Sequence, residues 1–185
     1  MPERSPSPPI RLNLGCGPHP VPGWLNADRQ PADGVDLCGD IRAGLALADD
    51  AVDCVVAIHF LQDLAWDAID PALREMRRVL RPGGMLRLAV PDLDRAIDAY
   101  RRGEGGYFFV PDADARSVGA KLVTQIIWYG SVRTPFTWDF AHEWLQGAGF
   151  REVARCAYRE TRHGDAAIIA LDNRERESLF IEALK

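Results

Sequence analysis

The hydrophobic and polar positions along the chain predict short strands separated by polar turns. Four apolar runs have the length of strands: residues 12–14, 24–27, 35–38 and 52–58. The last run is β-branched and nearly continuous, which is typical of a strand buried on both faces of a parallel sheet. We therefore expect these runs to form the centre of one sheet.

A helix and a fifth strand follow the fourth run. Apolar residues recur every three to four positions over 67–80, and Pro82-Gly83-Gly84 ends this helical spacing. Residues 85–90 have the composition of a strand, and Asp92 is a natural N-cap for the next helix. Strands that alternate with helices through short connections predict an α/β fold with a doubly wound parallel sheet.

The chain beyond Tyr100 is less regular. The spacing is partly helical over 114–128, indicates a short helix over 139–146, and alternates like a strand over 150–158. Two stretches compete for the last strand, 166–171 and 178–184. We expect the strand at 178–184 and a helical turn at 166–171.

A glycine turn and an acidic residue indicate a nucleoside site near the N-terminus. Gly15-Cys16-Gly17 follows the first strand, and Asp28 follows the second. Glycines allow a sharp turn and a close approach of ligand to backbone. Ligands of open α/β sheets bind beyond the carboxyl ends of the strands, where a carboxylate suits the two hydroxyls of a ribose.

The residues after this turn argue against two other nucleotide sites. A dinucleotide fingerprint needs a third glycine that opens a helix, whereas Gly17 is followed by Pro18-His19-Pro20-Val21-Pro22. The sequence contains no P-loop pattern and no Tyr-x-x-x-Lys pair. An NAD-dependent oxidoreductase or epimerase is therefore disfavoured.

Composition narrows the class of protein. The 185 residues suit one domain, so we expect a flexible tail at 1–10, which is rich in Pro and Ser, and a single domain at 11–185. The net charge of −5 argues against nucleic acid as a partner. No apolar run reaches the length of a membrane span, and four dispersed cysteines predict reduced thiols in a cytoplasmic protein.

Three stretches of the sequence resemble the class I S-adenosylmethionine-dependent methyltransferases. They are LNLGCG at the first strand, VDCVVAIHFLQDL at the fourth, and ALREMRRVLRPGGMLRLAVPD through the fifth. GWLNAD, VPD and LDNRERESLFIEALK are similar to a group of small bacterial methyltransferases of unassigned substrate. The resemblance implies a Rossmann-like, seven-stranded, mostly parallel sheet in three α/β/α layers. Asn13 and Gln62-Asp63 depart from the pattern, which usually has an acid and Glu-His there.

The resemblance also implies which residues bind S-adenosylmethionine and, after transfer, S-adenosylhomocysteine. The backbone of the glycine turn would lie against the methionine part, Asp28 would bind the ribose, and Asp40 with the Ile41 amide would hold the adenine. Arg29 either covers the adenine or faces solvent. The candidate cofactor residues are Leu14, Gly15, Cys16, Gly17, Asp28, Arg29, Asp40, Ile41 and His59.

Candidate catalytic residues are His59, Asp63 and His142. His59 ends the fourth strand beside the expected methyl donor, but it could equally be a neutral histidine bonded to nearby backbone. Asp63 could orient a base or simply open a helix at the surface. His142 lies among aromatic residues at helical spacing, which more often form core than an acceptor site. We expect no metal, because Asp92 and Asp94 lack a third ligand.

The sequence thus predicts methyl transfer to oxygen or nitrogen of a small acceptor: a sugar, a lipid-linked intermediate or a secondary metabolite. Acceptor specificity would come from the loops after the fourth and fifth strands and from 100–144, which are apolar and aromatic with few basic residues. A non-catalytic S-adenosylmethionine-binding protein of the same fold is the alternative. The oligomeric state, monomer or homodimer, stays open.

Overall fold

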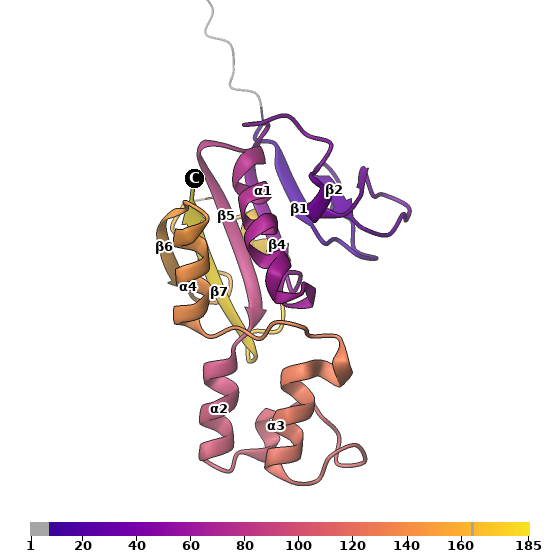
Figure 1. The fold of residues 1–185 in the computed structure, drawn as a ribbon, viewed down its shortest axis with the longest axis vertical. Helices are drawn as coiled ribbons and strands as arrows, with labels where there is room; N and C mark the ends of the chain where they lie inside the picture. The colour runs from indigo at the N-terminus through magenta and orange to yellow at the C-terminus, as the bar shows by residue number, and fades with distance from the viewer. Residues whose placement is uncertain (1–7, 164) are drawn as a thin grey trace, which may run out of the picture.

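Seven strands form one mixed sheet in the order β3-β2-β1-β4-β5-β7-β6 (Figure 1). The computed structural model describes residues 8–163 and 165–185, so most of the expected tail lies outside the described residues. The strands are β1 (Arg11–Leu14), β2 (Leu25–Asp28), β3 (Leu37–Cys38), β4 (Val52–Ile58), β5 (Leu80–Pro91), β6 (Arg151–Cys156) and β7 (Ser178–Leu184). The α-helices are α1 (Ile69–Val79), α2 (Leu93–Arg101), α3 (Val118–Ile127) and α4 (Trp138–Gly147).

The first five strands are parallel, and β7 runs antiparallel between β5 and β6. The prediction of the last strand at 178–184 is confirmed, and the competing stretch contains only a short 3-10 helix, η6 (Ile168–Leu171). Burial explains why the strand forms at 178–184, because six of the seven residues of β7 are buried between two neighbouring strands. The expected third strand at 35–38 is shorter, because only Leu37 and Cys38 pair with β2.

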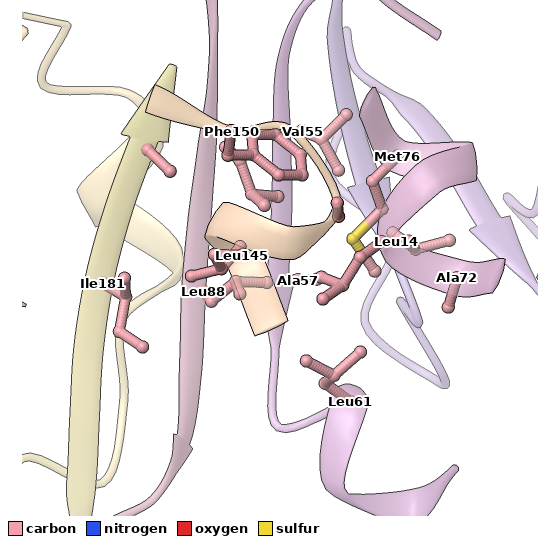
Figure 2. Close-up of a cluster of buried hydrophobic side chains, with 14 of the residues drawn as sticks. Leu14, Val55, Ala57, Leu61, Ala72, Met76, Leu88, Leu145, Phe150 and Ile181 are labelled. Carbon is pink, nitrogen blue, oxygen red and sulfur yellow. The ribbon is translucent and has the colours of Figure 1, made fainter. Parts of the chain in front are cut away.

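The main core lies between the sheet and the helices α1 and α4. Leu14, Val55, Leu88 and Ile181 come from four different strands and point to the same face, where Met76 of α1 and Leu145 of α4 cover them (Figure 2). The helical spacing at 67–80 and 139–146 therefore reports the apolar sides of α1 and α4. This face is a conventional helix-on-sheet layer.

The opposite face of the sheet is covered differently. Cys54 and Val56 of β4 pack there against Ile168 of η6, and in the described part of the chain no α-helix joins them. The connections at 15–24 and 29–36 explain the difference from an ordinary three-layer fold. They are short and rich in proline and glycine, whereas a helical crossover between parallel strands needs a dozen or more residues.

A buried ion cluster also lies on this second face. Arg87 of β5 is fully buried and binds Asp172 at 2.5 Å and Glu182 of β7 at 2.9 Å. The Arg87 guanidinium also donates to the carbonyls of Ala157 and Glu160, so its donors bind the loop between β6 and β7. The loop is thus attached to the sheet through one charged side chain.

The helices α2 and α3 lie beyond the carboxyl ends of the strands (Figure 1). Asp92 caps α2 as expected, because its carboxylate accepts from the Arg95 amide at 3.2 Å. The partly helical stretch at 114–128 contains α3, which packs against α2. Among the described residues, no helix is long and apolar enough to span a membrane.

Loss of Asp172 should destabilise the fold strongly. An Asp172→Ala substitution leaves the Arg87 charge buried with one carboxylate fewer, which costs about 3–5 kcal/mol of the free energy of unfolding. Urea denaturation measures the loss. The matched control is Asp165→Ala, which removes a partly exposed partner of Arg11 and should cost less than about 1 kcal/mol. Equal losses would contradict the role of the buried cluster.

Candidate functional site

Two neighbouring cavities open at the carboxyl ends of β1, β2 and β4. Each has a volume of about 230 Å³, and Asp63 lines both of them. The first cavity is lined by Leu14, Gly15, Asp28, Arg29, Gln30, Gly39, Asp40, Ile41, Arg42, Phe60, Asp63, Leu64, Ala65 and Arg133. The second is lined by His59, Gln62, Asp63, Pro91, Gln125, Trp128, Ser131, Val132, Arg174 and Glu177.

The glycine turn and the acid of β2 meet in the first cavity. The two carboxylate oxygens of Asp28 accept from the backbone amides of Gly17 and Gln30, each at 2.9 Å. The Gly15 amide donates to the Ala27 carbonyl at 2.8 Å. These bonds hold the ends of β1 and β2 together, as the sequence predicts for a nucleoside site.

Gly15 is the tightest point of this turn. Its φ is +73°, and a Cβ atom there would lie 2.5 Å from the ring of Phe60. Gly17 also has positive φ, +51°, but a Cβ there would meet no described atom within 4 Å. Gly15 is therefore required by packing, whereas the space beside Gly17 is open.

Asp40 is the acid of the cofactor set with the strongest partner. It caps the 3-10 helix η1 (Ile41–Ala43) by accepting from the Arg42 amide at 2.9 Å, and it binds the Arg42 guanidinium. These hydrogen bonds lower the pKa of Asp40 to about 2, so the carboxylate is ionised at neutral pH. A ligand on Asp40 would share the carboxylate with Arg42.

Six of the nine candidate cofactor residues line the first cavity: Leu14, Gly15, Asp28, Arg29, Asp40 and Ile41. Of the other three, Gly17 donates its amide hydrogen to Asp28, Cys16 is buried in the turn, and His59 lines the second cavity. The sequence did not indicate Phe60, Arg42 or Arg133. Arg133 comes from a distant loop whose amides at 133 and 134 donate to the Gln62 carbonyl, and no local pattern predicts that contact.

His59 contacts the hydroxyl of Ser178. The imidazole Nε2 lies 2.8 Å from this hydroxyl, which also lies 2.8 Å from the Arg174 carbonyl. A hydroxyl carries one proton, so when Ser178 donates to Arg174 it accepts from Nε2–H, and Nδ1 is then an acceptor. The His59 partner is thus a side chain rather than the backbone that the simpler interpretation expected.

The environment of His59 keeps the ring neutral. Burial and the nearby Arg174 charge lower the pKa of His59 to about 4. Its Nδ1 is buried and has no hydrogen-bond partner among the described residues. His59 also has φ of +52°, a conformation that histidine, asparagine and aspartate tolerate better than most side chains.

Gln62 and Asp63 add further polar groups to the lining of the second cavity. The Gln62 amide nitrogen donates to the His59 carbonyl at 2.6 Å and to Asp63 at 3.2 Å, so the amide oxygen faces elsewhere. That oxygen, Oε1, is buried and also lacks a described partner. Asp63 ends the 3-10 helix η2 (Leu61–Asp63) instead of opening a helix, and partial burial raises its pKa.

His142 lies away from both cavities. It is on α4, its ring centroid is 5.3 Å from that of Trp138, and it lines neither cavity. The structure therefore brings together only two of the three candidate catalytic residues, His59 and Asp63. Helical spacing alone did not show that no residue of α4 lines either cavity.

Comparisons with known proteins relate part of the chain to one domain family. Residues 16–88 match the family model described as "Methyltransferase domain". An uncharacterized 37.1 kDa protein in transposon TN4556 of Streptomyces fradiae is 48% identical over 110 residues, covering 45% of this chain and 30% of that protein. The chain thus covers less than a third of that relative's length.

Solved structures share the whole fold. An S-adenosylmethionine-dependent methyltransferase of Thermotoga maritima, described as a possible histamine N-methyltransferase, has a TM-score of 0.58 at 19% identity, covering 100% of this chain and 84% of that one. Methyltransferases of Mesorhizobium loti and Methanosarcina mazei have TM-scores of 0.54 and 0.56 at 18% and 16% identity, covering 96% of this chain and 91% and 92% of theirs.

Residues 16–88 are thus similar to a methyltransferase domain, and the chain shares the Rossmann-like class I fold of solved S-adenosylmethionine-dependent methyltransferases. The cofactor named for these solved proteins is S-adenosylmethionine. The residues of the first cavity fit this molecule. Gly39 leaves open space where a side chain would stand, and Asp28 and Asp40 offer carboxylates to hydroxyl and amine hydrogens.

Enlarging Gly15 should damage the site more than enlarging Gly17. Both alanine variants adopt an unfavourable positive φ, which costs about 1–2 kcal/mol, but only Gly15→Ala also collides with Phe60. We expect Gly15→Ala to lose more unfolding free energy and to weaken S-adenosylhomocysteine binding at least tenfold. Calorimetry and urea unfolding measure both effects. If Gly17→Ala were the more damaging variant, the packing at Gly15 would not be the critical contact.

Acid should destabilise the protein through His59. The unfolded chain protonates His59 near pH 6.5 and the folded chain only near pH 4, so the unfolded state binds more protons between these values. The free energy of unfolding should therefore fall by about 2 kcal/mol from this group between pH 7 and pH 5. His59→Asn should remove that part of the pH dependence, whereas the control His142→Asn should retain it. Identical profiles for wild type and His59→Asn would refute the assignment.

Proposed function

We propose that the protein is an S-adenosylmethionine-dependent methyltransferase that transfers a methyl group to nitrogen or oxygen of a small acceptor. The supporting observation is the pair of cavities that share Asp63, because methyl transfer needs a donor and an acceptor side by side.

The first cavity would bind the cofactor. Asp28 would accept from the ribose hydroxyls, Asp40 and the Ile41 amide would hold the adenine edge, and the turn from Leu14 to Gly17 would lie beside the methionine part. When bound, the cofactor supplies a methyl group on a positively charged sulfur. The protein then has mainly to align the reacting atoms, and such positioning can provide roughly 7–11 kcal/mol of the barrier.

The second cavity would bind the acceptor. Its residues come from the end of β4, the end of β5 and the segment 125–132, which agrees with the loops expected to set specificity, and also from 174–177. We infer one catalytic domain over 11–185. The four cysteines are free thiols, which suits a reducing compartment such as the cytoplasm.

A thermal-shift panel tests the proposal. S-adenosylmethionine and S-adenosylhomocysteine at a hundred times Kd should add about 2.7 kcal/mol to stability, a rise in Tm of about 5–10 °C. NAD and ATP should have no comparable effect. A shift with NAD or ATP instead would overturn the proposed cofactor. Binding of S-adenosylmethionine without turnover on any acceptor would favour the non-catalytic alternative.

The same assay tests the ribose contact. Asp28→Asn retains an acceptor for the Gly17 amide but removes the charge, so it should weaken cofactor binding about tenfold. The matched control is Asp33→Asn, an exposed residue outside both cavities, which should bind as the wild type does. Unchanged affinity of Asp28→Asn would refute this contact.

A further inference from the structure

The second cavity has an excess of hydrogen-bond acceptors. Nδ1 of His59 and Oε1 of Gln62 belong to two of its lining residues, and both atoms are buried without a partner among the described residues. Gln62 is only 4% exposed, so solvent cannot satisfy its oxygen freely. The Asp63 carboxylate adds further acceptors beside them.

The bonds on the other side of each group agree with this acceptor character. With Ser178 donating to the Arg174 carbonyl, His59 uses its Nε2 hydrogen on Ser178, and Gln62 uses its amide nitrogen on the His59 carbonyl and on Asp63. Neither group can therefore turn a donor toward a ligand without breaking existing bonds. A buried acceptor that stays unpaired costs about 1–3 kcal/mol, so a fitting ligand must supply hydrogens.

The charges of the lining favour a cationic ligand. Arg174 is the one basic residue of the described lining, and it is paired with Glu177 at 3.4 Å. Asp63 has no such ion pair among the described residues, and its only described side-chain partner is the neutral Gln62 amide. A protonated primary amine carries three donors, which matches the three neighbouring acceptors His59, Gln62 and Asp63.

The chemistry of methyl transfer separates an amine from an alcohol. An aliphatic hydroxyl is far less acidic than an ammonium, so removing its proton during attack needs a stronger base than the Asp63 carboxylate or His59, whose pKa is about 4. An ammonium needs only to give one proton to a carboxylate, and the neutral amine then attacks with its own lone pair. The lining of the second cavity offers hydrogen-bond acceptors and only weak bases, so it suits methyl transfer to nitrogen rather than to oxygen.

We infer that the second cavity binds a small primary amine and that the methyl group is transferred to its nitrogen. The inference rests on the proposed methyltransferase function. The bound ammonium first gives one proton to the Asp63 carboxylate, and the nitrogen lone pair then forms a bond to the methyl carbon. The carbon–sulfur bond breaks with its electron pair on sulfur, the product leaves as a methylammonium, and Asp63 gives its proton to water, which restores the carboxylate. Ser178 is a positioning residue, because it acts through the His59 tautomer.

Binding of matched probes to the full chain tests the inference. Benzylamine, benzyl alcohol and benzoate share one carbon skeleton, as do butylamine, butanol and butyrate. With S-adenosylhomocysteine saturating, calorimetry should show the amine of each set binding at least tenfold more tightly than its alcohol or acid. Equal or tighter binding of an alcohol or acid, or no binding of either amine, would overturn the inference. Failure of S-adenosylhomocysteine to bind would instead refute the proposed function.

Two variants and a ¹⁵N spectrum test which residues are responsible for the amine affinity. Gln62→Met removes one acceptor and should weaken amine binding about tenfold with cofactor affinity unchanged, whereas Gln146→Met, on the exposed side of α4, should change neither. The unfolding midpoint of each variant shows that it is folded. The ¹⁵N spectrum of His59 should show the Nε2–H tautomer in the wild type and lose that preference in Ser178→Ala. An Nδ1–H tautomer in the wild type, or unchanged amine affinity in folded Gln62→Met, would also overturn the inference.

Discussion

The contact between Gly15 and the ring of Phe60 determines how the site is built. It brings the exit of β1 against the exit of β4 at a distance that a side chain on residue 15 would prevent. Phe60 then lines the first cavity, and His59, one residue earlier, lines the second. The positive φ of His59 turns the chain between the two positions. Two binding spaces thus arise from consecutive residues at one strand end.

Much of the sheet could be predicted because its strands carry local signals. The run over 52–58 matches β4 residue for residue, since a strand buried on both faces must be apolar throughout. The last strand was correctly expected at 178–184, but the stretch at 166–171 competed with it, and burial between two strands distinguishes them only in the structure. The limits of α3 and of β3 were less accurate, because few of their residues are buried.

The site was only partly predictable, because several of its residues come from segments that lie far apart in the sequence. Gly15, Asp28 and Asp40 could be identified because each follows a strand whose end is visible in the sequence. Arg133, Arg174 and Glu177 reach the cavities from segments that lie far from those strands in the sequence. Their positions depend on tertiary contacts such as the bond between the Arg133 amide and the Gln62 carbonyl. His142 shows the reverse case, because it is chemically suitable but lines neither cavity.

Asp63 lines both cavities, so ligands bound on its two sides interact with one carboxylate. A positively charged donor on one side stabilises the ionised carboxylate, which in turn attracts a cation on the other side. Such coupling is reciprocal, since each ligand must change the affinity of the other by the same factor. In the proposed methyl transfer the sulfur would lose its charge, and that mutual support would be lost for both products. A single shared side chain would then favour formation of the substrate complex and release of the products.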